Sequence, residues 1–113
     1  MVKVDDLLKF EGVTTLPSSR DHLEVDGIVF LHGHYTKLGD HAKFFRKPVV
    51  HGHTHRIGIF YERISDGLIW EMDCGYLADE KSLPLQYTAS KFSKWIKAVG
   101  IIDNGQPRLV VLE

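Results

Sequence analysis

Two short, continuously apolar runs, each followed directly by a histidine and a glycine, constrain the fold of this chain most. Ile28 to Leu31 is followed by His32-Gly33, and Val49-Val50 is followed by His51-Gly52. Runs of this kind are typical of strands buried on both faces. Each histidine is therefore expected where a buried strand passes into a loop. Because loops held on a rigid scaffold commonly carry function, we expect a site at these two strand ends.

Histidines are concentrated in these two loops. Five of the seven histidines lie there, alternating with other residues: His32 and His34 in the first loop, and His51, His53 and His55 in the second. Residues two apart in an extended segment point to the same side, and neutral imidazole is the commonest metal ligand in proteins. The spacing therefore predicts that His53 and His55 converge on a metal ion, with the histidines of the first loop nearby.

The rest of the pattern predicts an α+β fold dominated by antiparallel sheet. Turn signals at Ser65-Asp66-Gly67 and Asn104-Gly105 indicate two hairpins, because glycine tolerates positive φ. The expected strands are Val13 to Leu16, Leu23 to Leu31, Val49 to His51, Ile57 to Tyr61, Leu68 to Met72, Lys94 to Ile102 and Arg108 to Leu112. Helices are expected over Asp5 to Phe10 and over Lys37 to Lys47, and Asp79 to Ser90 is expected to be irregular.

Composition narrows the class of protein. The chain has 113 residues, of which 43% are hydrophobic, so residues 1–113 are expected to form a single domain with a buried core. A net charge of -1 implies no general affinity for nucleic acid or acidic membranes. Cys74 is the sole cysteine, and no apolar run approaches the roughly 20 residues of a membrane span. We therefore expect a cytoplasmic protein in a reducing compartment.

Gly52-His53-Thr54-His55, together with an upstream strand that ends in His32-Gly33, resembles the C-terminal half of a calcineurin-like metallophosphoesterase. The resemblance extends from about Leu7 onward and is greatest to a compact, often phage-borne branch of that family. It implies a two-sheet β-sandwich flanked by helices. It also implies hydrolysis of phosphomonoesters or phosphodiesters, with nucleic acid among the candidate substrates. The cofactors implied are two divalent ions drawn from Mn, Zn, Fe and Ni.

The same resemblance assigns roles to particular residues. By that resemblance His32 and His53 ligate the second metal ion, and His55 ligates the first. Arg56, directly after the motif, is expected either to pair with a phosphate oxygen through its planar guanidinium or to be solvated.

Neighbouring residues are assigned supporting roles. His34 is expected either to face substrate or to be exposed. His51 is expected to orient a ligand by hydrogen bonding, and Thr54 to hold the loop. His22 and His41 are expected to be solvated.

The chain departs from the family in the ligands of the first half. An Asp-x-His motif, a bridging Gly-Asp and an Asn-His pair are all absent upstream of His32. Gly39-Asp40 comes after His32 and opens the predicted helix, so Asp40 is interpreted as a capping or first-turn residue. Without the bridging carboxylate, at most one ion is expected to be held well.

These observations leave three functional hypotheses open. The favoured one is a phosphoesterase C-terminal part that needs an N-terminal part, with a separate chain or self-association covering its exposed sheet edge. The second is a degenerate, non-catalytic module that binds metal or protein. The third is a self-sufficient hydrolase with one zinc held by His32, His53 and His55.

Overall fold

The computed structural model describes residues 11–13, 16, 18, 21–77 and 95–112. Their order is β1 (His22–Val25), β2 (Ile28–Leu31), α2 (Asp40–Phe45), β3 (Val49–His51), β4 (Ile57–Ile64), β5 (Gly67–Cys74), β6 (Ala98–Asp103) and β7 (Gln106–Val111). This is an α+β fold in which strands dominate, as the sequence predicted. The predicted helix at 5–10 and irregular segment at 79–90 lie outside the described residues, and the run at 13–16 lies only partly within them.

The strands form two sheets. Five of them form a mixed sheet in the order β1-β2-β3-β5-β4, and β6 and β7 form a separate antiparallel hairpin. Within the larger sheet, β2 pairs in parallel with β3, and β3 pairs in parallel with β5. The other two pairings, β1 with β2 and β4 with β5, are antiparallel. The three central strands therefore end at the same edge.

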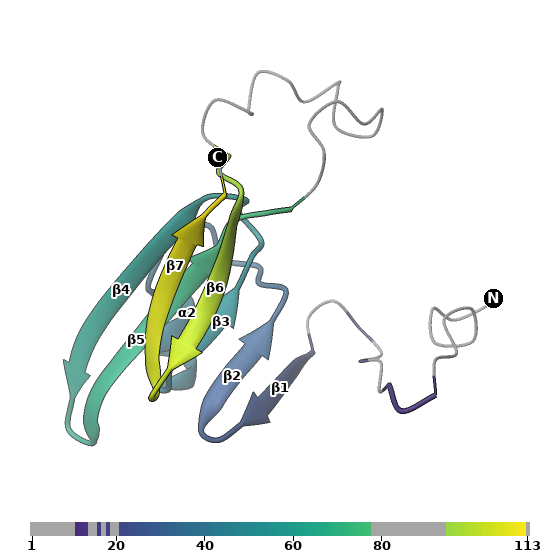
Figure 1. The fold of residues 1–113 in the computed structure, drawn as a ribbon. Helices are drawn as coiled ribbons and strands as arrows, with labels where there is room; N and C mark the ends of the chain where they lie inside the picture. Colours follow the sequence, from purple (N-terminus) through teal and green to yellow (C-terminus); the bar gives the residue numbers. More distant parts are fainter. Residues whose placement is uncertain (1–10, 14–15, 17, 19–20, 78–94, 113) are drawn as a thin grey trace.

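The larger sheet is covered on both faces, as Figure 1 shows, with the β6–β7 hairpin on one side and α2 on the other. Val29, Val49 and Ile69 pack with Ala42 of α2. On the opposite face, Ile28, Trp70 and Met72 pack against hairpin residues that include Ile102 and Leu109. The indole N–H of Trp70 also donates to the carbonyl of Gly105, 3.2 Å away, and so fastens the hairpin turn to the sheet.

The structure corrects the predicted strand over Leu23 to Leu31. That run is a hairpin, because Asp26 and Gly27 have φ values of 53° and 78° and turn the chain between β1 and β2. The predicted double-sided burial applies to the first half of β2, where Ile28 is 9% and Val29 is 0% exposed. Phe30 and Leu31 are only half-buried.

The predicted helix over Lys37 to Lys47 is also shorter in the structure. Gly39, with φ 105°, precedes it, and Arg46, with φ 53°, ends it. The N-cap residue is Gly39, which has no side chain to cap the helix, and Asp40 lies in the first turn. In the part of the chain that the structure describes, no helix is long and apolar enough to cross a membrane.

Candidate metal centre

The two histidine loops meet at one edge of the sheet. His32 follows β2 and His51 ends β3, and these strands are parallel neighbours. The amide of Gly52 donates to the carbonyl of His32 at 3.3 Å, which continues the pairing of the two strands into the loops. The third parallel strand places Asp73 beside His51 at the same edge. This is the edge at which open sheets with parallel strands commonly bind ligands.

His32 and His53 form a pair at the rim of this edge, called here the rim pair. Their ring centroids lie 5.2 Å apart, at an interplanar angle of 63°. His32 is exposed and His53 is half-buried. The Nδ1 of His32 lies 3.0 Å from the carbonyl of Gly33. A carbonyl only accepts, so Nδ1 donates and Nε2 keeps the lone pair that a metal ion would bind.

Gly33 is what lets the two loops approach so closely. Its φ is +105°, which L side chains rarely adopt, and a Cβ atom built there would lie 2.8 Å from the Cβ of His53. The same atom would lie 3.3 Å from both Cβ and Nδ1 of His51. A side chain at position 33 would therefore push the rim pair apart.

The electrostatics around His53 favour the neutral form of its ring. Burial lowers the pKa of His53 below its ordinary value of 6.5, and the nearby charges of His32, His51 and His55 lower it further. Asp73 acts in the opposite direction. Because a metal ion binds the unprotonated imidazole nitrogen, the lowered pKa keeps His53 in its ligating form.

The ring of His55, the third predicted ligand, lies among aromatic side chains. His55 has φ 61°, in the left-handed region. Its ring packs against Tyr76 at 5.6 Å and against Trp95 at 4.4 Å between centroids. The structure thus brings the rings of His32 and His53 together and gives His55 a separate aromatic setting.

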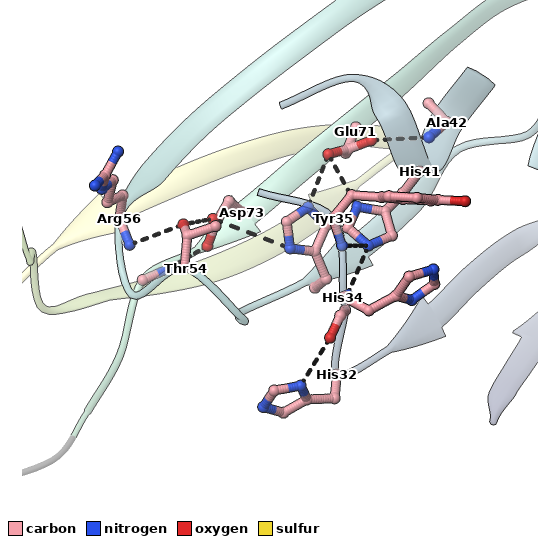
Figure 2. A network of polar contacts seen from close by, with 12 residues as sticks. His32, His34, Tyr35, His41, Ala42, Thr54, Arg56, Glu71 and Asp73 are labelled. Carbon is pink, nitrogen blue, oxygen red and sulfur yellow. Dashed lines mark hydrogen bonds and ion pairs between the residues drawn. The ribbon is translucent and has the colours of Figure 1, made fainter. Parts of the chain in front are cut away.

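Thr54 and Arg56, two further residues predicted from the sequence, lie beside Asp73 at this edge (Figure 2). The hydroxyl of Thr54 donates to Asp73 and accepts from the backbone N–H of Arg56, 3.3 Å away. A second oxygen of Asp73 accepts from the amide of Gly75 at 3.2 Å. Arg56 itself is exposed. These contacts tie the loop that carries His53 to Asp73 at the end of β5.

His34 and His51 border the interior of the same edge. The Nδ1 atoms of both rings are buried and have no hydrogen-bond partner among the described residues. The ring of His34 packs against Tyr35, with centroids 4.2 Å apart. His51 borders a pocket of about 180 Å³ that Thr54, Asp73 and Arg56 also line.

Beneath the rim lies a fully buried polar group, the glutamate hub, made of His41, His51 and Glu71. Glu71 Oε2 lies 2.8 Å from His51 Nε2 and 3.4 Å from His41 Nδ1. His41 and Glu71 are 0% exposed and His51 is 4% exposed. Each residue of the hub offers a ligand atom, and these atoms all lie within 4.8 Å of one another, so the group could hold a metal ion.

Hydrogen bonds keep Glu71 ionised despite its burial. Burial alone would raise the pKa of this carboxyl, but the hydrogen bond from His51 and the backbone N–H groups of Gly39 and Ala42 lower it from 4.5 to about 2. In His41, burial lowers the pKa, and the neighbouring His51 lowers it further. The hub therefore holds an ionised carboxylate beside His41, whose lowered pKa favours the neutral ring.

The expectation that His41 is solvated was wrong. His41 begins the inward face of α2, where Ala42 beside it is also 0% exposed. His22 is exposed as expected, but it lies in β1 and its ring centroid is 4.9 Å from that of Phe45. Glu71 was not among the site residues predicted from the sequence. Its signal was a single carboxylate inside the apolar run Leu68 to Met72.

Comparison of the chain with protein-family models, with curated proteins and with solved structures found no match. We therefore infer the function from the residues at this edge of the sheet and from their geometry.

Proposed function

We propose that this chain is the C-terminal part of a metal-dependent phosphoesterase and that the rim pair holds its divalent ion. The observation that carries the proposal is the approach of His32 and His53 at the shared end of two parallel strands, 5.2 Å between ring centroids. In a tetrahedral site with Zn–N bonds of about 2.0–2.1 Å, two imidazole centroids lie roughly 5 Å apart. The spacing of the rim pair therefore suits a shared ion.

A bound divalent ion would activate a water molecule and stabilise the charge that develops on the phosphate oxygens. In this proposal His32 and His53 hold that ion, and His55 belongs to a second ion in the complete site. Arg56, exposed beside the motif, pairs with a phosphate oxygen of the substrate through its guanidinium. The substrate is a phosphomonoester or phosphodiester, nucleic acid included, and the free thiol of Cys74 suits a reducing compartment such as the cytoplasm.

We further propose that an N-terminal part supplies the carboxylate ligands and covers β1. All four residues of this edge strand are exposed, with Leu23 at 52% and Val25 at 45%. They pair with Phe30 and Ile28 respectively, so their side chains share the face on which Ile28 packs with Trp70. An exposed edge strand with apolar residues favours pairing with another chain.

This arrangement predicts self-association when the chain is alone. The solution mass from light scattering is expected to exceed that of one chain. The double variant L23K/V25K is expected to shift it toward the monomer, since charges on an edge strand oppose pairing. A stable, well-dispersed monomer of the unmodified chain would contradict this part of the proposal.

Hydrolysis of bis(4-nitrophenyl) phosphate and 4-nitrophenyl phosphate with added Mn²⁺, Zn²⁺, Fe²⁺ or Ni²⁺ tests the activity. We expect hydrolysis when the chain is combined with the product of the adjacent upstream reading frame, and loss of it in His53→Ala. Hydrolysis that survives chelation of the metal would contradict the mechanism. Metal binding to the combined chains without any hydrolysis would favour the alternative, a non-catalytic module that binds metal or protein.

A further inference from the structure

We propose that Glu71 is a positioning residue that fixes both loops of the rim pair by holding the glutamate hub in one pattern of hydrogen bonds. The hub touches each loop at a residue two positions from a rim histidine. His51 precedes His53 by two residues and His34 follows His32 by two. The role in metal binding rests on the proposed function, whereas the hydrogen-bond pattern does not.

The hydrogen bonds of His41 fix its tautomer. Its Nε2 lies 3.0 Å from the backbone N of His34 and 3.2 Å from that of Tyr35. Both are N–H donors, so Nε2 accepts and the ring proton lies on Nδ1. That proton faces Glu71 Oε2 at 3.4 Å. Through His41, Glu71 therefore anchors the loop that follows β2 (Figure 2).

His51 anchors the second loop in the same way. Its Nε2 donates to Glu71 Oε2 at 2.8 Å, because an ionised carboxylate only accepts. This places the His51 ring at the end of β3 and turns its Nδ1 toward Asp73, whose Oδ2 is 4.0 Å away. The loop that carries His53 leaves from this fixed ring.

Only a carboxylate meets all the demands made on Glu71. Its Oε1 accepts from the backbone N–H of Ala42 at 2.8 Å, the backbone N–H of Gly39 also donates to the carboxylate, and Oε2 faces the two histidine N–H groups. Every partner of Glu71 in the described part of the chain is thus a donor. A glutamine at position 71 would turn its NH₂ group toward N–H groups whichever way it lay, and a buried clash of donors is costly.

This pattern also assigns the hub and the rim pair to different tasks. For the hub to bind a metal ion, His41 Nδ1 would have to lose its proton, and Nε2 would then carry one against the N–H groups of His34 and Tyr35. The rim pair carries no such conflict, because His32 donates through Nδ1 and its Nε2 has no hydrogen-bond partner among the described residues. We therefore assign the hub to positioning and the rim pair to the metal ion.

The test uses the tag-free chain and the variant Glu71→Gln, with Glu62→Gln as matched control. Glu62 lies on the adjacent strand β4, opposite Ile69, and is half-buried. The readouts are histidine tautomers by ¹⁵N NMR, hydrogen exchange of the His34 and Tyr35 amides, and Zn²⁺ affinity by calorimetry. In Glu71→Gln we expect His41 and His51 to lose their single tautomers. We also expect faster exchange of both amides and Zn²⁺ binding weakened about 10–100-fold. Glu62→Gln should match the unmodified chain.

A second variant keeps the proposal testable if Glu71→Gln does not fold. His41→Ala leaves the His51–Glu71 contact in place, so faster exchange should be confined to His34 and Tyr35 and their neighbours. A folded Glu71→Gln variant with unchanged exchange and unchanged Zn²⁺ affinity would overturn the proposal. Zn²⁺ binding that survives in His32→Ala/His53→Ala but not in Glu71→Gln would make the hub itself the metal site.

Failure of the proposed function would look different. If the unmodified chain binds no Zn²⁺, the metal centre is refuted. The tautomers and amide exchange still decide whether Glu71 fixes the two loops.

Discussion

Replacing Gly33 by alanine probes directly the close approach of the two histidine loops. The φ of +105° at this position disfavours any L side chain, at a cost of about 1–3 kcal/mol. The added Cβ would lie 2.8 Å from the Cβ of His53, closer than real Cβ atoms come. Displacing the side chain of His53 adds overpacking of about 1–3 kcal/mol. We expect Gly33→Ala to lower the free energy of unfolding by about 2–6 kcal/mol.

The variant Gly27→Ala separates the backbone cost of a positive φ from the cost of overpacking. Gly27 has φ +78°, and a Cβ built there meets nothing within 4 Å, so only the backbone cost of about 1–2 kcal/mol remains. Urea unfolding of both variants, followed by circular dichroism, measures the difference. Gly33→Ala should also weaken Zn²⁺ binding, because it separates the rim pair, whereas Gly27→Ala should not. Equal losses of stability in the two variants, with equal Zn²⁺ affinity, would refute the reasoning.

Two further predictions concern acid stability and the sheet-to-hairpin contact. Glu71 has its pKa lowered from 4.5 to about 2, so its contribution of about 3 kcal/mol is present above pH 4.5 and is lost as the pH falls through 2. The pKa of His41 is lowered from 6.5, so this residue also lowers the free energy of unfolding as the pH falls. The reason is that the unfolded chain takes up a proton that the folded chain excludes. Urea unfolding across this range should show the free energy of unfolding falling steadily from about pH 6.5 downward, and a flat profile to about pH 3 would contradict it. Trp70→Phe removes the 3.2 Å hydrogen bond to Gly105 together with part of a buried ring, and should cost about 1–3 kcal/mol in the same assay. A loss below about 0.5 kcal/mol would show that the hairpin does not depend on this contact.

Local signals in the sequence predicted much of the fold. Asn104-Gly105 adopts φ values of 55° and 78° and joins β6 to β7, as expected of this dipeptide. Val49 to His51 is a strand, and its histidine lies at the predicted edge. Asp26-Gly27 carries the same kind of turn signal, although the apolar residues on both sides of it favour one continuous strand. In the structure the turn chemistry of this dipeptide prevails over the hydrophobic pattern.

The hub could not be predicted from such signals. His41 and Glu71 are 30 residues apart, and their contact depends on how α2 packs against β5. On a short helix that also carries Ala42 and Phe45, the sequence pattern does not determine whether the side chain of His41 is exposed or buried. The closeness of the rim pair was easier to predict, because parallel pairing of β2 and β3 brings the residues after both strands to one edge. The aromatic setting of His55 depends on Trp95, 40 residues further along the chain.

The location of a bound metal ion tests the central claim most directly. Anomalous diffraction at the zinc edge from Zn²⁺-soaked crystals of the chain would place the ion without reference to activity. We expect a peak about 2.0–2.1 Å from His32 Nε2 and from a ring nitrogen of His53. A peak enclosed by His41, His51 and Glu71, or no peak at this edge of the sheet, would contradict it.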